Sequence, residues 1–313
     1  MTEVNTRAAH NSVVARMGRL SADIDTAMAQ IGTGKRVQAP SDDPVAYSRA
    51  TAVRRAQAED AAGQRGIDAA NRRLTATDNA LESITNLVQR ARELALQGAN
   101  GTLSSENRAI VATELRELQA SFATLADSRG SDGERLFGGA AADRPAYALD
   151  ADGIMRWQGA GAAPRLRIGD AEVATGIEGP AAFGVTDAPD PAVDPLTQRK
   201  DLFATFTLLI EGLAEPDTAL RSASVTRSID LINGHVTRLA DARAATGARL
   251  ARLESDGERI EKAKLAGESD LSKLESVDMS EAIARLQRLT LVLEAAQASF
   301  AKTSSLSLWD ALR

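Results

Sequence analysis

The hydrophobic positions at both ends of the chain repeat with alternating spacings of three and four residues. Such a pattern is typical of a helix that buries one narrow stripe against a partner helix. The N-terminal stripe consists of Val13, Met17, Leu20, Ile24, Ala27 and Ile31. The C-terminal stripe consists of Met279, Ala282, Leu286, Leu289, Leu293, Ala296 and Phe300. We therefore expect the two ends of the chain to form long helices whose apolar sides pair.

Between the two ends, helical periodicity persists in long blocks. It covers residues 45–97, then a helix capped by Ser104 that runs to residue 125, and then residues 201–215. A further long helix is expected from about residue 217 to residue 274, after the break at Pro216. Helices of this length exceed those of an ordinary globular core, so they predict a mainly α fold built on a long antiparallel helical rod.

Residues 131–198 interrupt this pattern with a different composition. They contain six of the nine prolines, and their 11 acidic and 5 basic residues account for the net charge of the whole chain, −6. Residues 147–157 read as a hairpin that turns at Asp152-Gly153, and residues 166–168 and 171–173 form a second candidate pair. We expect a small, acidic, β-rich domain inserted between the helices and separable from them.

The composition excludes several classes of function. The 313 residues include no cysteine and only 3% aromatic residues, so there is no disulfide framework, no thiolate metal site and little material for an aromatic pocket. With two histidines, His10 and His235, neither a histidine metal site nor a Ser-His-Asp set is expected. The first 30 residues carry no cleavable signal peptide, and no apolar run reaches the roughly 18 residues of a membrane span. We expect no enzyme, no cofactor, no nucleic-acid partner and no membrane insertion.

A polar motif separates the first helix from the second. Gly34-Lys35-Arg36 resembles the end of a phosphate-binding loop, but the first glycine of such a loop is absent and Arg36 stands where Ser or Thr would bind magnesium. In the adjoining Pro40-Ser41-Asp42-Asp43-Pro44, Asp43 is positioned to cap a helix that has Pro44 at its first position. We therefore interpret the motif as a helix start that fixes the direction of the chain, rather than as a catalytic or metal site.

These motifs resemble those of the bacterial flagellin superfamily. The N-terminal signature consists of Gly34, Lys35, Arg36, Pro40, Ser41, Asp42, Asp43 and Pro44, and the C-terminal marks are residues 275–281 and the tail 305–312. Within the superfamily, the Pro-Ser-Asp-Asp-Pro form, residues 136–139 (Leu-Phe-Gly-Gly) and the Ser-Leu-Trp tail are similar to the hook-associated protein 3 family, whose members join hook to filament. Minor filament flagellins share most of these features.

The resemblance implies three nested parts. Residues 1–33 and 277–313 would form a terminal coiled-coil inner domain, residues 34–130 and 199–276 a helical rod domain, and residues 131–198 the inserted outer domain. It also implies self-association in a ring or helical layer and contact with a neighbouring hook-associated protein and flagellin. The resemblance further implies a flagellar export chaperone as a partner. It also implies type III export to the extracellular flagellum without a cleaved signal peptide.

The terminal stripes are the expected assembly seam, through which subunits join. Its residues are Val13, Met17, Leu20, Ile24, Ile31, Met279, Leu286, Leu289, Leu293, Phe300, Leu306 and Leu308. The first alternative to a hook–filament junction subunit is a filament-forming flagellin. The second is an adhesion or glycan-binding module on a coiled-coil stalk, in which Tyr147 and Trp157 are the aromatic residues able to stack on a sugar.

Overall fold

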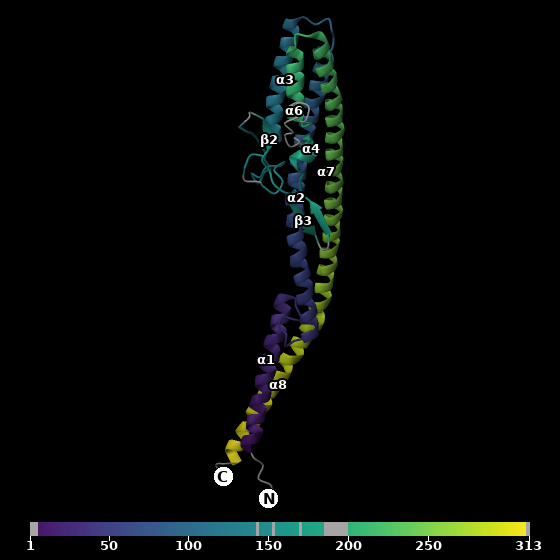
Figure 1. Cartoon of the computed structure of the whole chain (residues 1–313). Helices are drawn as coiled ribbons and strands as arrows, with labels where there is room; N and C mark the ends of the chain where they lie inside the picture. Colours follow the sequence, from purple (N-terminus) through teal and green to yellow (C-terminus); the bar gives the residue numbers. More distant parts are fainter. Residues whose placement is uncertain (1–5, 142–143, 152–153, 169–170, 185–199, 311–313) are drawn as a thin grey trace. The chain divides into compact units, whose positions relative to one another are not determined.

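Long helices from both halves of the chain dominate the structure (Figure 1). The computed structural model describes residues 6–141, 144–151, 154–168, 171–184 and 200–310. The helices are α1 (Thr6–Thr33), α2 (Pro44–Gly98), α3 (Ser105–Ala126), α4 (Gly179–Phe183), α6 (Leu202–Ala214), α7 (Thr218–Glu275) and α8 (Met279–Asp310). The strands are β1 (Tyr147–Leu149), β2 (Met155–Trp157), β3 (Arg165–Ile168) and β4 (Ala171–Ala174). The predicted mainly α fold with long helices from both ends is confirmed.

The chain divides into two compact units. Unit 1 consists of Met1–Asp60 and Glu261–Arg313, and unit 2 consists of Ala61–Ile260. Both units therefore take one part of α2 and one part of α7. The three-part division expected from the sequence has different boundaries and stays a prediction.

In unit 1, α1 and α8 lie side by side and run in opposite directions (Figure 1). The ring of His10 near the start of α1 contacts the ring of Phe300 late in α8, with centroids 4.8 Å apart. At the other end of the pair, the Val277 N–H donates to the Gly34 carbonyl over 3.0 Å. The expected pairing of the terminal helices is thus confirmed, and its register is fixed by contacts at both ends.

The core of unit 2 is built around Phe122 of α3, which is fully buried. Its ring contacts those of Phe183, Phe203 and Phe206, with centroid distances of 5.3, 4.4 and 6.1 Å. Aliphatic side chains of α2 and α7 complete this core, among them Leu81, Ile84, Val88, Leu94, Val225, Ile232 and Leu239. Few aromatic residues are present in the chain, and most of its phenylalanines are concentrated here.

The two predicted hairpins are present as short antiparallel pairs. Tyr147 pairs with Trp157 in the β1–β2 pair, and Leu166 pairs with Val173 in the β3–β4 pair. Both expected turns, at residues 152–153 and 169–170, lie outside the described residues. The strands contain three or four residues each, so turns and irregular backbone form most of the described part of the inserted segment.

The inserted segment buries several of its apolar residues in the helical core of unit 2. Leu136, Phe137, Tyr147 and Phe183 belong to the same buried cluster as Phe122. A second cluster joins the β3–β4 pair to the long helices, through Ile168, Val173, Ile67, Ala70, Leu74, Leu253 and Ile260. Since the segment shares these two clusters with the helices, we no longer expect it to be removable without loss of the core.

Candidate assembly surfaces

Most residues of the predicted assembly seam lie on the facing sides of α1 and α8, where they are only half-buried. These residues are Val13, Met17, Leu20, Ile24 and Ile31 of α1, and Leu286, Leu289, Leu293 and Phe300 of α8. Met279 differs, because its side chain is 42% exposed. Leu306 and Leu308 lie in a part of α8 whose side chains are outside the description. The fully buried apolar side chains along the described pair are the small ones, Ala27 and Ala282.

A second set of apolar side chains on the same helices faces solvent. These are Val14 and Met28 of α1 and Ile283, Leu291 and Val292 of α8. Leu291 is 67% exposed and Ile283 is 43% exposed. These side chains add to the apolar surface that the terminal pair leaves uncovered in the single chain. The heptad spacing does not reveal these residues because it marks one stripe of each helix, although Ile283 lies one helical turn beyond Met279.

The signature loop starts α2 as expected. The Asp43 carboxylate Oδ1 accepts the Ala46 N–H over 3.0 Å, and α2 begins at Pro44. Pro40 and Ser41 occupy the centre of a turn closed by the Asp42 N–H, which donates to the Ala39 carbonyl over 3.1 Å. The Asp42 carboxylate accepts the N–H groups of Gln38 and Ala39, each over 2.9 Å.

The charges of the two aspartates are stabilised by these bonds. The N–H donors of Ala39 and Gln38 lower the pKa of Asp42 below its ordinary value. The Ala46 N–H, and then the Arg36 side chain, lower the pKa of Asp43. Both carboxylates accept hydrogen bonds from nearby backbone N–H groups. This agrees with the expected helix start and gives no support to a catalytic or metal-binding role.

The first signature residues bind the C-terminal end of α7. Gly34 adopts a left-handed backbone conformation (φ +68°), and Lys35 then forms an antiparallel bridge with Ser276. The Arg36 N–H donates to the Glu275 carbonyl over 2.6 Å. The Lys35 Nζ lies 3.1 Å from the buried Glu275 carboxylate. Glu275 lies within the C-terminal mark at residues 275–281, but the sequence does not reveal its role because Arg54 is 221 residues away.

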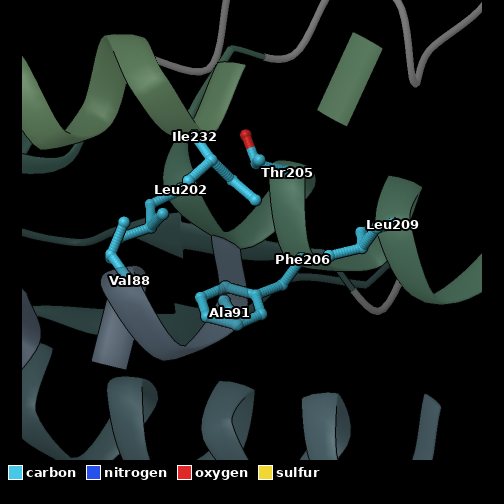
Figure 2. Close-up of a pocket in the computed structure, with 7 residues that line it drawn as sticks. All are labelled: Val88, Ala91, Leu202, Thr205, Phe206, Leu209 and Ile232. Carbon is cyan, nitrogen blue, oxygen red and sulfur yellow. The ribbon is translucent and has the colours of Figure 1, made fainter. Parts of the chain in front are cut away.

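One pocket, inside the core of unit 2, does not support a ligand site. It is lined by side chains of α2, α6 and α7, which Figure 2 shows around a common centre, namely Val88, Ala91, Leu202, Thr205, Phe206, Leu209 and Ile232. It leaves no space for a water molecule, so it is a small packing gap in the aromatic core. Over the described residues, no group of His, Cys, Asp or Glu side chains is arranged to hold a metal ion.

His235 is a core residue of unit 2. Its Nε2 lies 2.9 Å from the Thr205 hydroxyl, and its Nδ1 is buried without a hydrogen-bond partner. Burial lowers the pKa of His235 to about 4, with a smaller contribution of the same sign from Arg238. The imidazole is therefore neutral at physiological pH and has a structural role.

The two aromatic residues considered for sugar stacking face the interior. The Tyr147 ring is buried, with centroids 5.2 Å from Phe203 and 6.0 Å from Phe183. The Trp157 indole Nε1 donates to the Phe137 carbonyl over 2.8 Å. The glycan-binding alternative therefore loses the observation on which it depended.

Two family models match the chain. The bacterial flagellin N-terminal helical region matches residues 4–142, and the bacterial flagellin C-terminal helical region matches residues 229–310. These ranges contain the signature loop, the β-bridge at Lys35 and both terminal helices. The chain belongs to the bacterial flagellin superfamily. The resemblance inferred from the motifs is confirmed, and the superfamily is one of structural flagellar proteins.

Relatives within the superfamily differ in how much of the chain they match. Flagellar hook-associated protein 3 of Salmonella typhimurium is 25% identical over 90% of this chain and 90% of its own length. The flagellin of Listeria monocytogenes is 23% identical over 86% of this chain and 84% of its own length. A solved flagellar hook-associated protein of Vibrio parahaemolyticus has the same fold, with a TM-score of 0.65, 20% identity, and coverage of 75% of this chain and 100% of its own.

The chain is thus a component of the bacterial flagellum that assembles with other flagellar subunits and with itself. In the part of the chain that the structure describes, no helix combines the length and the apolar character needed to cross a membrane.

Proposed function

We propose that this chain is a structural subunit that joins the flagellar hook to the filament and performs no catalysis. The observation that carries the proposal is the similarity to hook-associated protein 3 along 90% of both chains. The match extends into the inserted segment, because its 289 residues exceed the combined length of the two helical regions that the family models match.

The terminal helices supply the joining surface in this proposal. The seam of α1 and α8 leaves residues such as Leu286, Leu289, Leu293 and Phe300 half-buried, and Ile283 and Leu291 exposed. Completing the burial of one such side chain against a neighbouring subunit contributes roughly 1.5–3 kcal/mol. A ring repeats the contact in every subunit, so a modest gain for each side chain becomes a stable layer.

The same proposal includes the remaining partners and the location. The neighbours are a hook-associated protein on one side and flagellin on the other, and a flagellar export chaperone binds the chain before assembly. The chain leaves the cell through the flagellar type III channel without cleavage of a signal peptide. The nested inner, rod and outer domains described above belong to this proposal as well.

A filament-forming flagellin is the second candidate. The similarity to the Listeria flagellin along 86% of the chain favours it, although at lower identity than hook-associated protein 3. The two candidates differ in growth: a flagellin polymerises without limit, whereas a junction subunit forms a short layer that ends.

Electron microscopy of the purified protein, alone and seeded on isolated hooks, separates these candidates. The junction function predicts a short terminal layer on hooks that then accepts flagellin, and no long filaments from the protein alone. Long filaments from the protein alone would transfer the assignment to flagellin. Binding to neither hooks nor flagellin would contradict both.

The Leu293→Asp variant tests whether the seam joins subunits. Burial of an unpaired carboxylate costs several kcal/mol, so incorporation at the hook tip should be lost and the exported variant should accumulate in the medium. The thermal unfolding of unit 2 should change little, because its core lies elsewhere. Leu265→Asp is the matched control, since Leu265 is an exposed leucine of α7 outside the seam. Normal assembly of Leu293→Asp would show that the seam is not the joining surface.

A further inference from the structure

The signature loop and the break between α7 and α8 bind each other through one buried carboxylate. The Glu275 side chain is only 8% exposed, whereas those of Lys35 and Arg54 are 50% and 44% exposed. Both cations bind the same carboxylate: the Lys35 Nζ lies 3.1 Å from Oε2, and an Arg54 guanidinium nitrogen binds Oε1. We call Glu275, Lys35 and Arg54 the Glu275 clasp.

Backbone hydrogen bonds join the same two segments, residues 34–36 and residues 274–277, on both sides of the Glu275 clasp. The Arg36 N–H donates to the Glu275 carbonyl, and the Val277 N–H donates to the Gly34 carbonyl, over 2.6 and 3.0 Å. The Arg36 guanidinium also donates to the Leu274 carbonyl over 3.1 Å. Cations and N–H donors thus converge on the last carbonyls of α7, where the helix dipole is negative.

The Glu275 clasp lies where α1 ends and α8 is about to begin. Gly34 directly follows α1, and Val277 stands two residues before the first residue of α8. A bond between these two residues fixes which turn of α1 faces which turn of α8. A shift of one residue along either helix rotates its apolar stripe by about 100°, so the register determines which side chains remain exposed. Loss of the clasp would therefore alter the surface that the terminal pair presents.

We propose that Glu275 is a positioning residue for assembly: with Lys35 and Arg54 it sets the register of α1 against α8, and so composes the surface that meets neighbouring subunits. This role gives the Gly34-Lys35-Arg36 part of the signature a physical function. The effect on incorporation rests on the proposed junction function, whereas the clasp itself is testable on the isolated chain.

Hydrogen exchange of the full-length monomer tests the clasp without any assembly. The amides of Arg36 and Val277 should be protected in the wild type. Glu275→Gln, which keeps the size of the side chain but removes its charge, should lower this protection by about tenfold, since both charge-assisted contacts of the carboxylate, to Lys35 and to Arg54, are lost. Asp270→Asn is the matched control, because Asp270 pairs with Lys273 on the same helix at an exposed site. Unprotected Arg36 and Val277 amides in the wild type, or equal protection in wild type and Glu275→Gln, would overturn the proposal.

A comparison of charge backgrounds separates the clasp from a general packing role. Lys35→Gln with Arg54→Gln leaves the Glu275 carboxylate buried without its two cations, and this double variant should lose incorporation at the hook tip. Adding Glu275→Gln removes the unpaired charge but does not restore the clasp, so the triple variant should also fail to incorporate. Arg54→Lys, which preserves the charge, should retain most of the incorporation.

The outcomes distinguish this inference from the proposed function. If the wild type binds hooks and the triple variant, which lacks the clasp, incorporates as well as the wild type, the clasp is not the positioning element. If the wild type does not bind hooks, the junction function fails, and the exchange measurement decides the clasp alone. Melting of unit 2 should be the same in all variants, and a lowered unit 2 melting temperature in Glu275→Gln would also overturn the assigned role.

Discussion

The aromatic core of unit 2 and the terminal pair of unit 1 bury their apolar side chains to very different extents. In unit 2, Phe122, Phe137 and Phe206 have almost no exposed surface. In the terminal pair, the large residues of the seam are half-buried and Leu291 is 67% exposed. The isolated chain can therefore satisfy the hydrophobic side chains of unit 2 but not those of α1 and α8. Contacts with other subunits, as proposed above, would complete the burial of the terminal pair.

The largest effect on unit 2 is expected from removing residues 131–198. The sequence suggested a separable domain, but the deletion takes Leu136, Phe137, Tyr147 and Phe183 out of the shared core. Loss of several large buried side chains exceeds the total stability of a typical domain, so unit 2 should unfold. Circular dichroism and hydrogen exchange would measure the loss of structure in unit 2. Cooperative unfolding of the deletion variant near the wild-type temperature would show that the helices have a sufficient core of their own.

A single truncation at the centre of the same core should have the next largest effect. Phe122→Ala removes the ring that contacts three other phenylalanines and should lower the free energy of unfolding of unit 2 by about 3–5 kcal/mol. Phe300→Ala is the paired change in the terminal helices, where the ring is only half-buried, and should leave unit 2 unchanged. Urea titrations of both variants measure the difference. Equal losses in the two variants would contradict the contrast between the units.

Acid should weaken unit 2 through His235. The folded pKa of about 4 lies below the ordinary value of 6.5, so the unfolded chain binds a proton more readily. The stabilisation from the neutral imidazole is therefore complete above pH 6.5 and is lost as the pH falls toward 4, by on the order of 2–3 kcal/mol. Urea unfolding of unit 2 at pH 7 and pH 4.5 should show a smaller pH dependence in His235→Gln than in the wild type. Parallel pH profiles would exclude His235 as the cause. Because the carboxylates are common to both proteins, the difference between the profiles isolates the histidine.

The smallest effect is expected at the partly exposed ion pairs between α2 and α7. In unit 2, the Arg243 Nε lies 3.1 Å from Asp78 Oδ1, and its Nη2 lies 3.6 Å from Glu82. The hydrogen bond from Arg243 to Asp78, and the charges of both carboxylates, raise the pKa of Arg243 further above its already high value, so its charge does not change at accessible pH. Arg243→Gln should cost at most about 1 kcal/mol in urea unfolding, because all three groups are solvent-accessible. A loss as large as that of Phe122→Ala would show that charge pairs, rather than the aromatic core, hold the helices together.

Local sequence patterns predicted the elements of both units well. The 3-4 spacing located α1 and α8, Ser104 and Asp43 capped the helices as expected, and the hairpins formed in the expected register range. These features depend on residues that are close in sequence, where propensity, capping and periodicity act directly.

The contacts that join distant segments could not be predicted in the same way. Arg54 and Glu275 are 221 residues apart, and each taken alone is an ordinary charged residue on a helix. The same limitation applies to Phe183, whose place beside Phe122 depends on how α4 folds back onto α3 and α6. Periodicity reveals that a side chain is buried, but it does not reveal which partner covers it.

Hydrogen exchange along the whole monomer tests the contrast between the units most directly. At micromolar concentration, with the monomeric state verified by ultracentrifugation, the amides of α1 and α8 should exchange rapidly, since an incompletely buried helix pair is marginal in water. The amides of α3, α6 and the unit 2 part of α7 should exchange slowly, near the rate set by global unfolding. Incorporation into the assembled layer should then protect α1 and α8. Strong protection of α1 and α8 in the verified monomer, equal to that of unit 2, would contradict the account.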